Sequence, residues 1–111
     1  LQIHGSIDAV VPYDGLLSIM KPVMEVMDYW KTANDCDEFV HTVPEIIAGE
    51  SSWTEIYLFE NCLNDTQNIH LKVQGAGHIW PGSTFESIKD PDTSNQIWEF
   101  FSRYDINGVI Q

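Results

Sequence analysis

Residues 68–82, NIHLKVQGAGHIWPG, join a strand pattern directly to a histidine that follows small residues. Apolar side chains at alternate positions from Ile69 to Val73 predict a strand with one buried face. Gly, Pro and Ser are frequent in residues 76–91, which therefore form a predicted loop. Reactive side chains in open α/β sheets gather on loops at the carboxyl ends of strands, so His78 is a candidate catalytic base.

Residues 1–15, LQIHGSIDAVVPYDG, show the same arrangement at the start of the chain. A short apolar strand ends at Gly5, and the loop after it carries Asp8. If the two strands are neighbours, Asp8 accepts the ring N–H of His78, fixes its tautomer and stabilises the imidazolium. The pair supplies two of the three groups of a nucleophile–base–acid triad, with the acid before the base as in α/β-hydrolases.

The remaining sequence predicts two helices and two further strands. Apolar residues at helical spacing predict a helix over 21–33, and a second helix over 92–104 starts with a Thr93/Gln96 capping box. Residues 38–47 and 53–61 read as the strands of a hairpin. The buried helix faces are expected to contain Trp30, Ile97, Trp98, Phe100 and Phe101.

This order of elements predicts the α/β class, with parallel strands joined by a crossover helix, an inserted β-hairpin and a C-terminal helix. Two central strands are too few for a closed sheet, so strand 1–5 is expected to have an open edge. Either a missing N-terminal half of the protein or a second copy of the chain would cover that edge. Residues 1–4 already read as strand, with no initiator Met or signal segment before them, which indicates that the gene product starts upstream.

Charge and hydropathy exclude several kinds of partner. Lys and Arg number 5 against 17 Asp and Glu, and the net charge of −12 disfavours nucleic acid and anionic membrane surfaces. No apolar run approaches the roughly 20 residues that cross a bilayer. A neutral or cationic ligand stays open.

The two cysteines, Cys36 and Cys62, lie beside turn-forming residues and have no CxxC spacing or nearby histidine, which disfavours a zinc site. A disulfide between them would close a loop of about 25 residues, stabilise the fold by roughly 3 kcal/mol and indicate an oxidising compartment. Two free thiols are the alternative.

Five stretches together resemble a known family: LQIHGSIDAVVPYDG, VMDYWKTANDCD, YLFENC, VQGAGHIWPG and IWEFF. They are similar to the C-terminal half of secreted esterases that include polyhydroxybutyrate depolymerases and feruloyl esterases, a group of α/β-hydrolases. The resemblance implies that residues 1–111 are the C-terminal fragment of such a catalytic domain, that Asp8 and His78 are the acid and base of a Ser–His–Asp triad, and that Cys36 pairs with Cys62.

The chain departs from that family at the nucleophile. None of its eight serines lies in a GxSxG sequence, and the segment expected to form the oxyanion hole is also absent. An acid and a base without a nucleophile predict that these 111 residues do not hydrolyse esters alone.

Other candidate residues have competing interpretations. Asp14 is a rival acid, although Asp-Gly is typical of turns. His4 either packs at its strand end or forms hydrogen bonds in the acid loop. A metal site formed by His4, Asp8 and His78 lacks any known ligand spacing, so we expect neither a metal nor another cofactor. Trp80 either lines a substrate pocket or stiffens its loop.

The sequence therefore predicts a carboxylic ester hydrolase that is secreted or periplasmic. Its substrate would be a polyester such as polyhydroxybutyrate, a feruloyl or acetyl ester of the plant cell wall, or a smaller ester. The alternatives are a truncated, non-catalytic acidic module for binding or assembly, and another serine hydrolase such as a peptidase.

Overall fold

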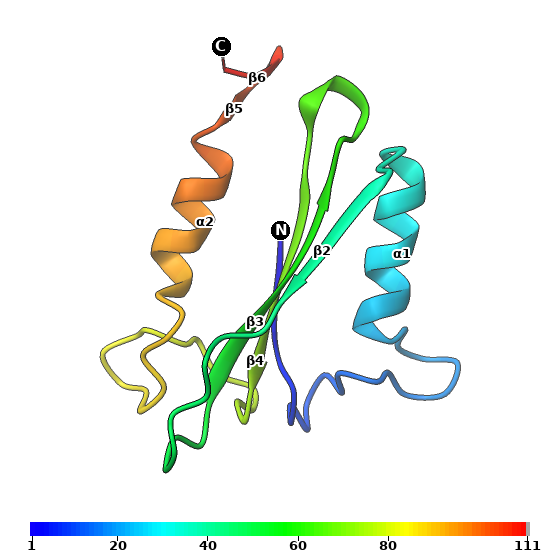
Figure 1. Ribbon diagram of the computed structural model, residues 1–111. Helices are drawn as coiled ribbons and strands as arrows, with labels where there is room; N and C mark the ends of the chain where they lie inside the picture. The colour runs from blue at the N-terminus through cyan, green and yellow to red at the C-terminus, as the bar shows by residue number, and fades with distance from the viewer. Residues whose placement is uncertain (111) are drawn as a thin grey trace.

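The computed structural model describes residues 1–110, which form two helices and two small sheets (Figure 1). The elements are, in chain order, β1 (Gln2–Gly5), α1 (Val23–Ala33), β2 (Glu38–Thr42), β3 (Trp53–Glu60), the 3-10 turn η1 (Leu63–Asp65), β4 (Asn68–Gln74), α2 (Thr93–Phe101), β5 (Tyr104–Asp105) and β6 (Gly108–Val109).

The periodicities located these elements to within a few residues. The expected strand at 68–75 is β4, and the expected helix at 21–33 is α1, which begins at Val23 directly after Pro22. The strand predicted over 38–47 is shorter, because β2 ends at Thr42 and an irregular segment with Pro44 follows. Proline lacks the N–H that a paired strand needs, which accounts for the early end.

The main sheet has the order β1-β4-β3-β2, and only β1 and β4 run parallel. Both other pairs, β4–β3 and β3–β2, are antiparallel. The expected architecture, half of an α/β-hydrolase built on parallel strands, is therefore wrong. The link from β3 to β4 is residues 61–67, which is shorter than the dozen or more residues that a parallel crossover needs, so β3 must turn back along β4.

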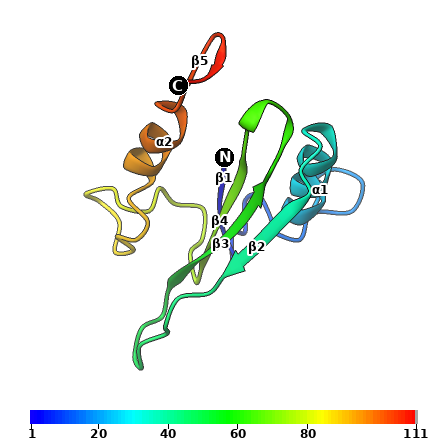
Figure 2. The same cartoon turned by 45° about the horizontal axis from the view of Figure 1, so that its top comes forward.

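Figures 1 and 2 show α1 and α2 on opposite sides of this sheet. The face under α1 holds the best-packed core, which contains Tyr13, Val23, Met27, Cys36, Phe59 and Cys62. The face towards α2 buries Leu71 and Val73, but it leaves much apolar surface open. The prediction that Trp30, Trp98 and Phe101 lie on buried helix faces is wrong, since they are 49%, 71% and 57% exposed.

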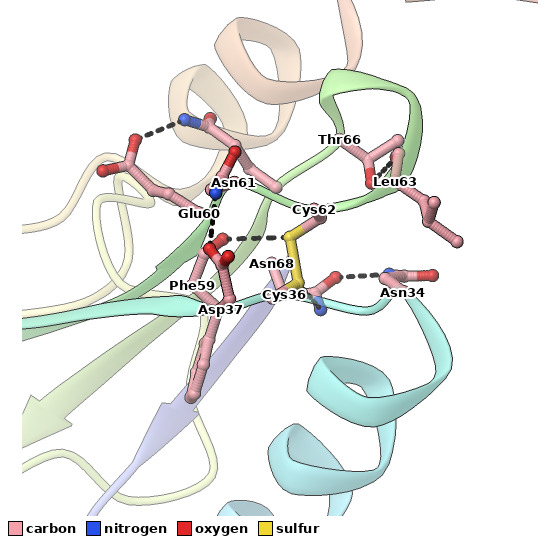
Figure 3. The surroundings of a disulfide bond; sticks show 11 residues. Asn34, Cys36, Asp37, Phe59, Glu60, Asn61, Cys62, Leu63, Thr66 and Asn68 are labelled. Atoms are coloured by element: carbon pink, nitrogen blue, oxygen red, sulfur yellow. Dashed lines mark hydrogen bonds between the residues drawn. A yellow bond between two sulfur atoms is a disulfide. The ribbon is translucent and has the colours of Figure 1, made fainter.

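The disulfide between Cys36 and Cys62 joins the end of α1 to the segment after β3 (Figure 3). Both cysteines are buried in the α1 core, and the described part of the chain contains no free cysteine. Asn34 Nδ2 donates to Asn68 Oδ1 at 2.8 Å, and Asn68 Nδ2 donates in turn to Cys36 Sγ at 3.5 Å. The bridge therefore ties α1, β3 and the start of β4 into one unit.

Strands β1 and β2 form the two edges of the main sheet. Within residues 1–110, β1 pairs only with β4, so its other side presents unpaired backbone groups. No helix among the described residues is long and apolar enough to cross a membrane.

Candidate functional site

The site forms where the parallel strands β1 and β4 end side by side. Gly5, the last residue of β1, is paired in register with Val73 near the end of β4. The backbone after β4 then passes directly over Gly5, where a Cβ atom would overlap the carbonyl oxygens of Ala76 and Gly77. Only glycine allows this approach, which brings the loops that follow the two strands together.

The approach places the Asp8 carboxylate against the His78 ring. His78 Nδ1 lies 2.9 Å from Asp8 Oδ2, although the residues are 70 positions apart in the chain. The Asp8 side chain is only 7% exposed, whereas that of His78 is 57% exposed. A buried carboxylate thus holds one nitrogen of an imidazole whose ring faces solvent.

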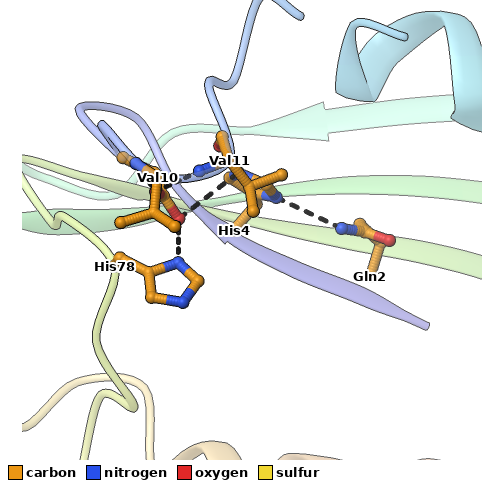
Figure 4. Close-up of polar contacts among 6 residues, drawn as sticks. Gln2, His4, Val10, Val11 and His78 are labelled. Atoms are coloured by element: carbon orange, nitrogen blue, oxygen red, sulfur yellow. Dashed lines mark hydrogen bonds and ion pairs between the residues drawn. The ribbon is translucent and has the colours of Figure 1, made fainter. Parts of the chain in front are cut away.

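Backbone amides hold Asp8 from its other side. Its Oδ1 accepts the N–H of Val10 at 2.9 Å and the N–H of Val11 at 2.8 Å. His4 fixes the same loop, since its Nε2–H donates to the Val11 carbonyl at 2.7 Å (Figure 4). This bond agrees with the interpretation of His4 as a residue that hydrogen-bonds in the acid loop, and His4 Nε2 also lies 3.7 Å from Asp8 Oδ2.

These contacts decide the charge of the acid. Burial raises the pKa of the Asp8 carboxyl, but the hydrogen bonds from Val11, His78 and Val10 outweigh it and hold the pKa below its ordinary value. Asp8 is therefore ionised at neutral pH, and it orients His78 with Nδ1 protonated and Nε2 free to accept a proton.

A cavity of about 170 Å³ opens beside the pair and is lined by both Asp8 and His78. Among residues 1–110, no hydroxyl or thiol forms a hydrogen bond with His78, whose ring bonds only to Asp8. The rival acid, Asp14, is exposed, and within the described residues it forms no hydrogen bond or ion pair with the imidazole. The arrangement is a base with its orienting acid, open on the side where a reacting group would lie.

Trp80 lies two residues beyond the base and is 52% exposed. Its indole N–H donates to Ser94 Oγ at 3.2 Å, so the ring is tied to the start of α2. A second cavity, of about 260 Å³, lies against this ring and shares Ile3, Ile79 and Pro81 with the cavity at the acid and base. Trp80 therefore does line a pocket, and it also braces its loop.

Two further histidines, His70 in β4 and His41 in β2, also take part in defined polar contacts. His70 is fully buried in β4, donating from Nδ1 to the Gln2 carbonyl at 3.1 Å and accepting from the Tyr13 hydroxyl at 2.9 Å. Burial lowers the pKa of His70 to about 4, against a smaller opposing effect of the Gln2 hydrogen bond. His70 is thus a neutral structural residue, and alternation of apolar neighbours in the strand gave no sign of it.

His41 forms a second pair with a carboxylate, between the edge strand β2 and its neighbour β3. Its Nε2 lies 3.0 Å from Glu55 Oε1, and Glu55 also accepts from Gln74 and Trp53 side chains. Burial raises the pKa of the Glu55 carboxyl, but the hydrogen bonds from Gln74, His41 and Trp53 outweigh this effect and hold the pKa below its ordinary value. The Glu55 carboxylate bonds Nε2 of His41, whereas Asp8 bonds Nδ1 of His78. The His41–Glu55 contact depends on the register of β2 against β3, which the sequence pattern does not predict.

No three His, Cys, Asp or Glu side chains among the described residues are placed to hold a metal ion. Comparison with known proteins adds no further assignment: no protein-family model, no curated protein and no solved structure matches this chain.

Proposed function

We propose that this chain supplies the acid and the base of a carboxylic ester hydrolase. The observation that carries the proposal is the 2.9 Å contact between Asp8 Oδ2 and His78 Nδ1, with the rest of the imidazole open to solvent. His78 Nε2 takes the proton of a serine hydroxyl as its oxygen attacks the ester carbonyl, and then delivers that proton to the departing alcohol. Water deacylates the enzyme by the same two proton transfers.

The ionised state of Asp8 supports this role. A carboxylate that is buried, bonded to two amides and kept charged stabilises the imidazolium that forms when His78 accepts a proton. The HGSIDAVVPY and GAGHIWPG stretches, which resemble the secreted esterases, point to the same two residues. The proposal does not require the α/β-hydrolase architecture, because unrelated folds build the same constellation.

The nucleophile has to come from polypeptide outside residues 1–111, since no serine of this chain bonds to His78 in the described part. We propose that this polypeptide also covers the open edge of β1. The substrate class is a polyester or a plant cell-wall ester, and the Cys36–Cys62 disulfide supports an oxidising, secreted or periplasmic location.

The test uses the complete reading frame that contains these residues, assayed on a short p-nitrophenyl ester. We expect His78→Ala to lower kcat/KM on the order of a thousandfold or more, and Asp8→Asn to lower it strongly as well. His41→Ala is the matched control, because His41 also pairs with a buried carboxylate but lies away from the cavity. Full activity in the His78 or Asp8 variant would show that these residues are not the base and the acid. A reading frame that encodes no nucleophile and hydrolyses no ester would favour the non-catalytic binding module.

A further inference from the structure

His4, on β1, has its two ring nitrogens bonded to different partners (Figure 4). Its Nε2 lies 2.7 Å from the Val11 carbonyl oxygen, and its Nδ1 lies 3.3 Å from Gln2 Nε2. A carbonyl oxygen can only accept a hydrogen bond, so Nε2 carries the proton and Nδ1 accepts from the Gln2 amide. His4 is therefore held in the tautomer opposite to that of His78, whose Nδ1 donates to Asp8.

Val11 connects this histidine to the acid. Its N–H donates to Asp8 Oδ1 at 2.8 Å, while its carbonyl oxygen accepts from His4. A shift of Val11 would therefore move the amide that holds the carboxylate. The backbone of His4 is paired with Lys72 of β4, so the bond from His4 to Val11 ties the acid loop to the sheet.

Packing and a neighbouring amide fix the orientation of the His4 ring. The side chain is only 9% exposed, and the Tyr13 ring packs edge-on against it, with ring centroids 5.8 Å apart. Gln2 lies two residues earlier on the same face of β1, which brings its amide to Nδ1. In a neutral ring, a proton on Nδ1 would face the Gln2 N–H and would leave the Val11 carbonyl without its donor.

We propose that His4, with its proton on Nε2, is a positioning residue that holds the Asp8 carboxylate against His78, and that the Gln2 side chain selects this tautomer. Loss of the bond to Val11 lets the acid loop move and loosens the contact between Asp8 and His78. A misplacement of about 1 Å can lower a catalysed rate about a hundredfold. The effect on ester hydrolysis rests on the proposed function, whereas the tautomers of the two histidines do not.

The first experiment is NMR of the protein from the complete reading frame, with isotope-labelled histidine, at about pH 8, above the ordinary pKa of histidine. Nitrogen chemical shifts distinguish a protonated from a bare ring nitrogen. We expect the proton on Nε2 in His4 and on Nδ1 in His78. In Gln2→Leu, which keeps the main-chain carbonyl that His70 bonds, His4 should become a mixture of both tautomers.

The decisive variant is His4→Leu, in which His78 should lose part of its Nδ1-protonated form because Asp8 is held less firmly. His41→Leu is the matched control, since it removes a histidine from the other carboxylate and should leave His78 as in the wild type. Urea unfolding shows whether each variant is folded. A proton on Nδ1 of His4 in the wild type, or an unchanged His78 tautomer in both His4→Leu and Gln2→Leu, would overturn the inference.

The second experiment measures hydrolysis of a short p-nitrophenyl ester by the same variants. His4→Leu should lower kcat about ten- to a hundredfold and leave KM within about twofold. His4→Gln should recover most of this loss, because its amide can still donate to the Val11 carbonyl. A higher KM with unchanged kcat in His4→Leu would show that His4 only shapes the cavity, and would refute the positioning role. If the wild type hydrolyses no ester, the proposed function fails, while the tautomers still decide whether His4 holds the acid.

Discussion

The fold should lose stability between pH 7 and pH 5, and replacement of His70 by glutamine should abolish most of that loss. The pKa of His70 lies at about 4 in the folded chain against 6.5 for an ordinary histidine, because the ring is fully buried. The unfolded chain therefore takes up this proton first as the pH falls, and stability is lost progressively from about pH 6.5 down to about pH 4. The full difference corresponds to about 3 kcal/mol, of which about 2 kcal/mol falls between pH 7 and pH 5.

The assay is urea unfolding of the chain at pH 7 and at pH 5, followed by tryptophan fluorescence with the disulfide intact. Glutamine keeps a donor and an acceptor for the Gln2 carbonyl and the Tyr13 hydroxyl, so His70→Gln is expected to fold but to be less sensitive to pH. The Asp8 and Glu55 carboxyls, with lowered pKa values, lose their stabilising effect only below about pH 4, outside this window. If His70→Gln loses as much stability from pH 7 to pH 5 as the wild type, the buried imidazole is not the cause and the reasoning fails.

Two further predictions concern the scaffold. Reduction of the Cys36–Cys62 bridge, which spans 26 positions, should lower the free energy of unfolding by about 3 kcal/mol, measured as the shift in urea midpoint with a reductant; an unchanged midpoint would contradict the loop-closure argument. Gly82→Ala should destabilise the fold by more than Gly49→Ala in thermal melts, since both glycines have positive φ but only at Gly82 does a Cβ atom meet neighbouring backbone. Equal effects at the two positions would show that backbone strain alone accounts for the loss.

The local structure was predictable because it depends on short-range patterns. Alternation of apolar residues located β4, and helical spacing located α1, from side chains a few positions apart. The strand pairing was not, because the same alternation fits a parallel or an antiparallel neighbour. The length of the link 61–67 was the available signal that β3 runs antiparallel to β4.

The sequence predicted the two side chains of the candidate site, but it did not predict the backbone groups that hold the carboxylate in place. The meeting of Asp8 with His78 followed from two loops at the ends of two strands. The amides of Val10 and Val11 that hold the carboxylate belong to the backbone, which sequence patterns do not describe. The expected Thr93/Gln96 capping box was wrong for a related reason. Asp92, one residue earlier, caps α2 by accepting the Asn95 N–H, and the sequence pattern fits either residue as the cap.

The uncovered side of β1 gives the acidity of the chain a physical role. An exposed strand edge is a template onto which identical molecules can stack, and β1 has neither proline nor lysine to prevent it. A net charge of −12 on 111 residues makes every such encounter repulsive, most strongly when little salt is present to screen it. The solubility of this molecule therefore depends on its sheet topology. Concentrated salt screens the repulsion and allows self-association through the open strand, which dilute buffer suppresses.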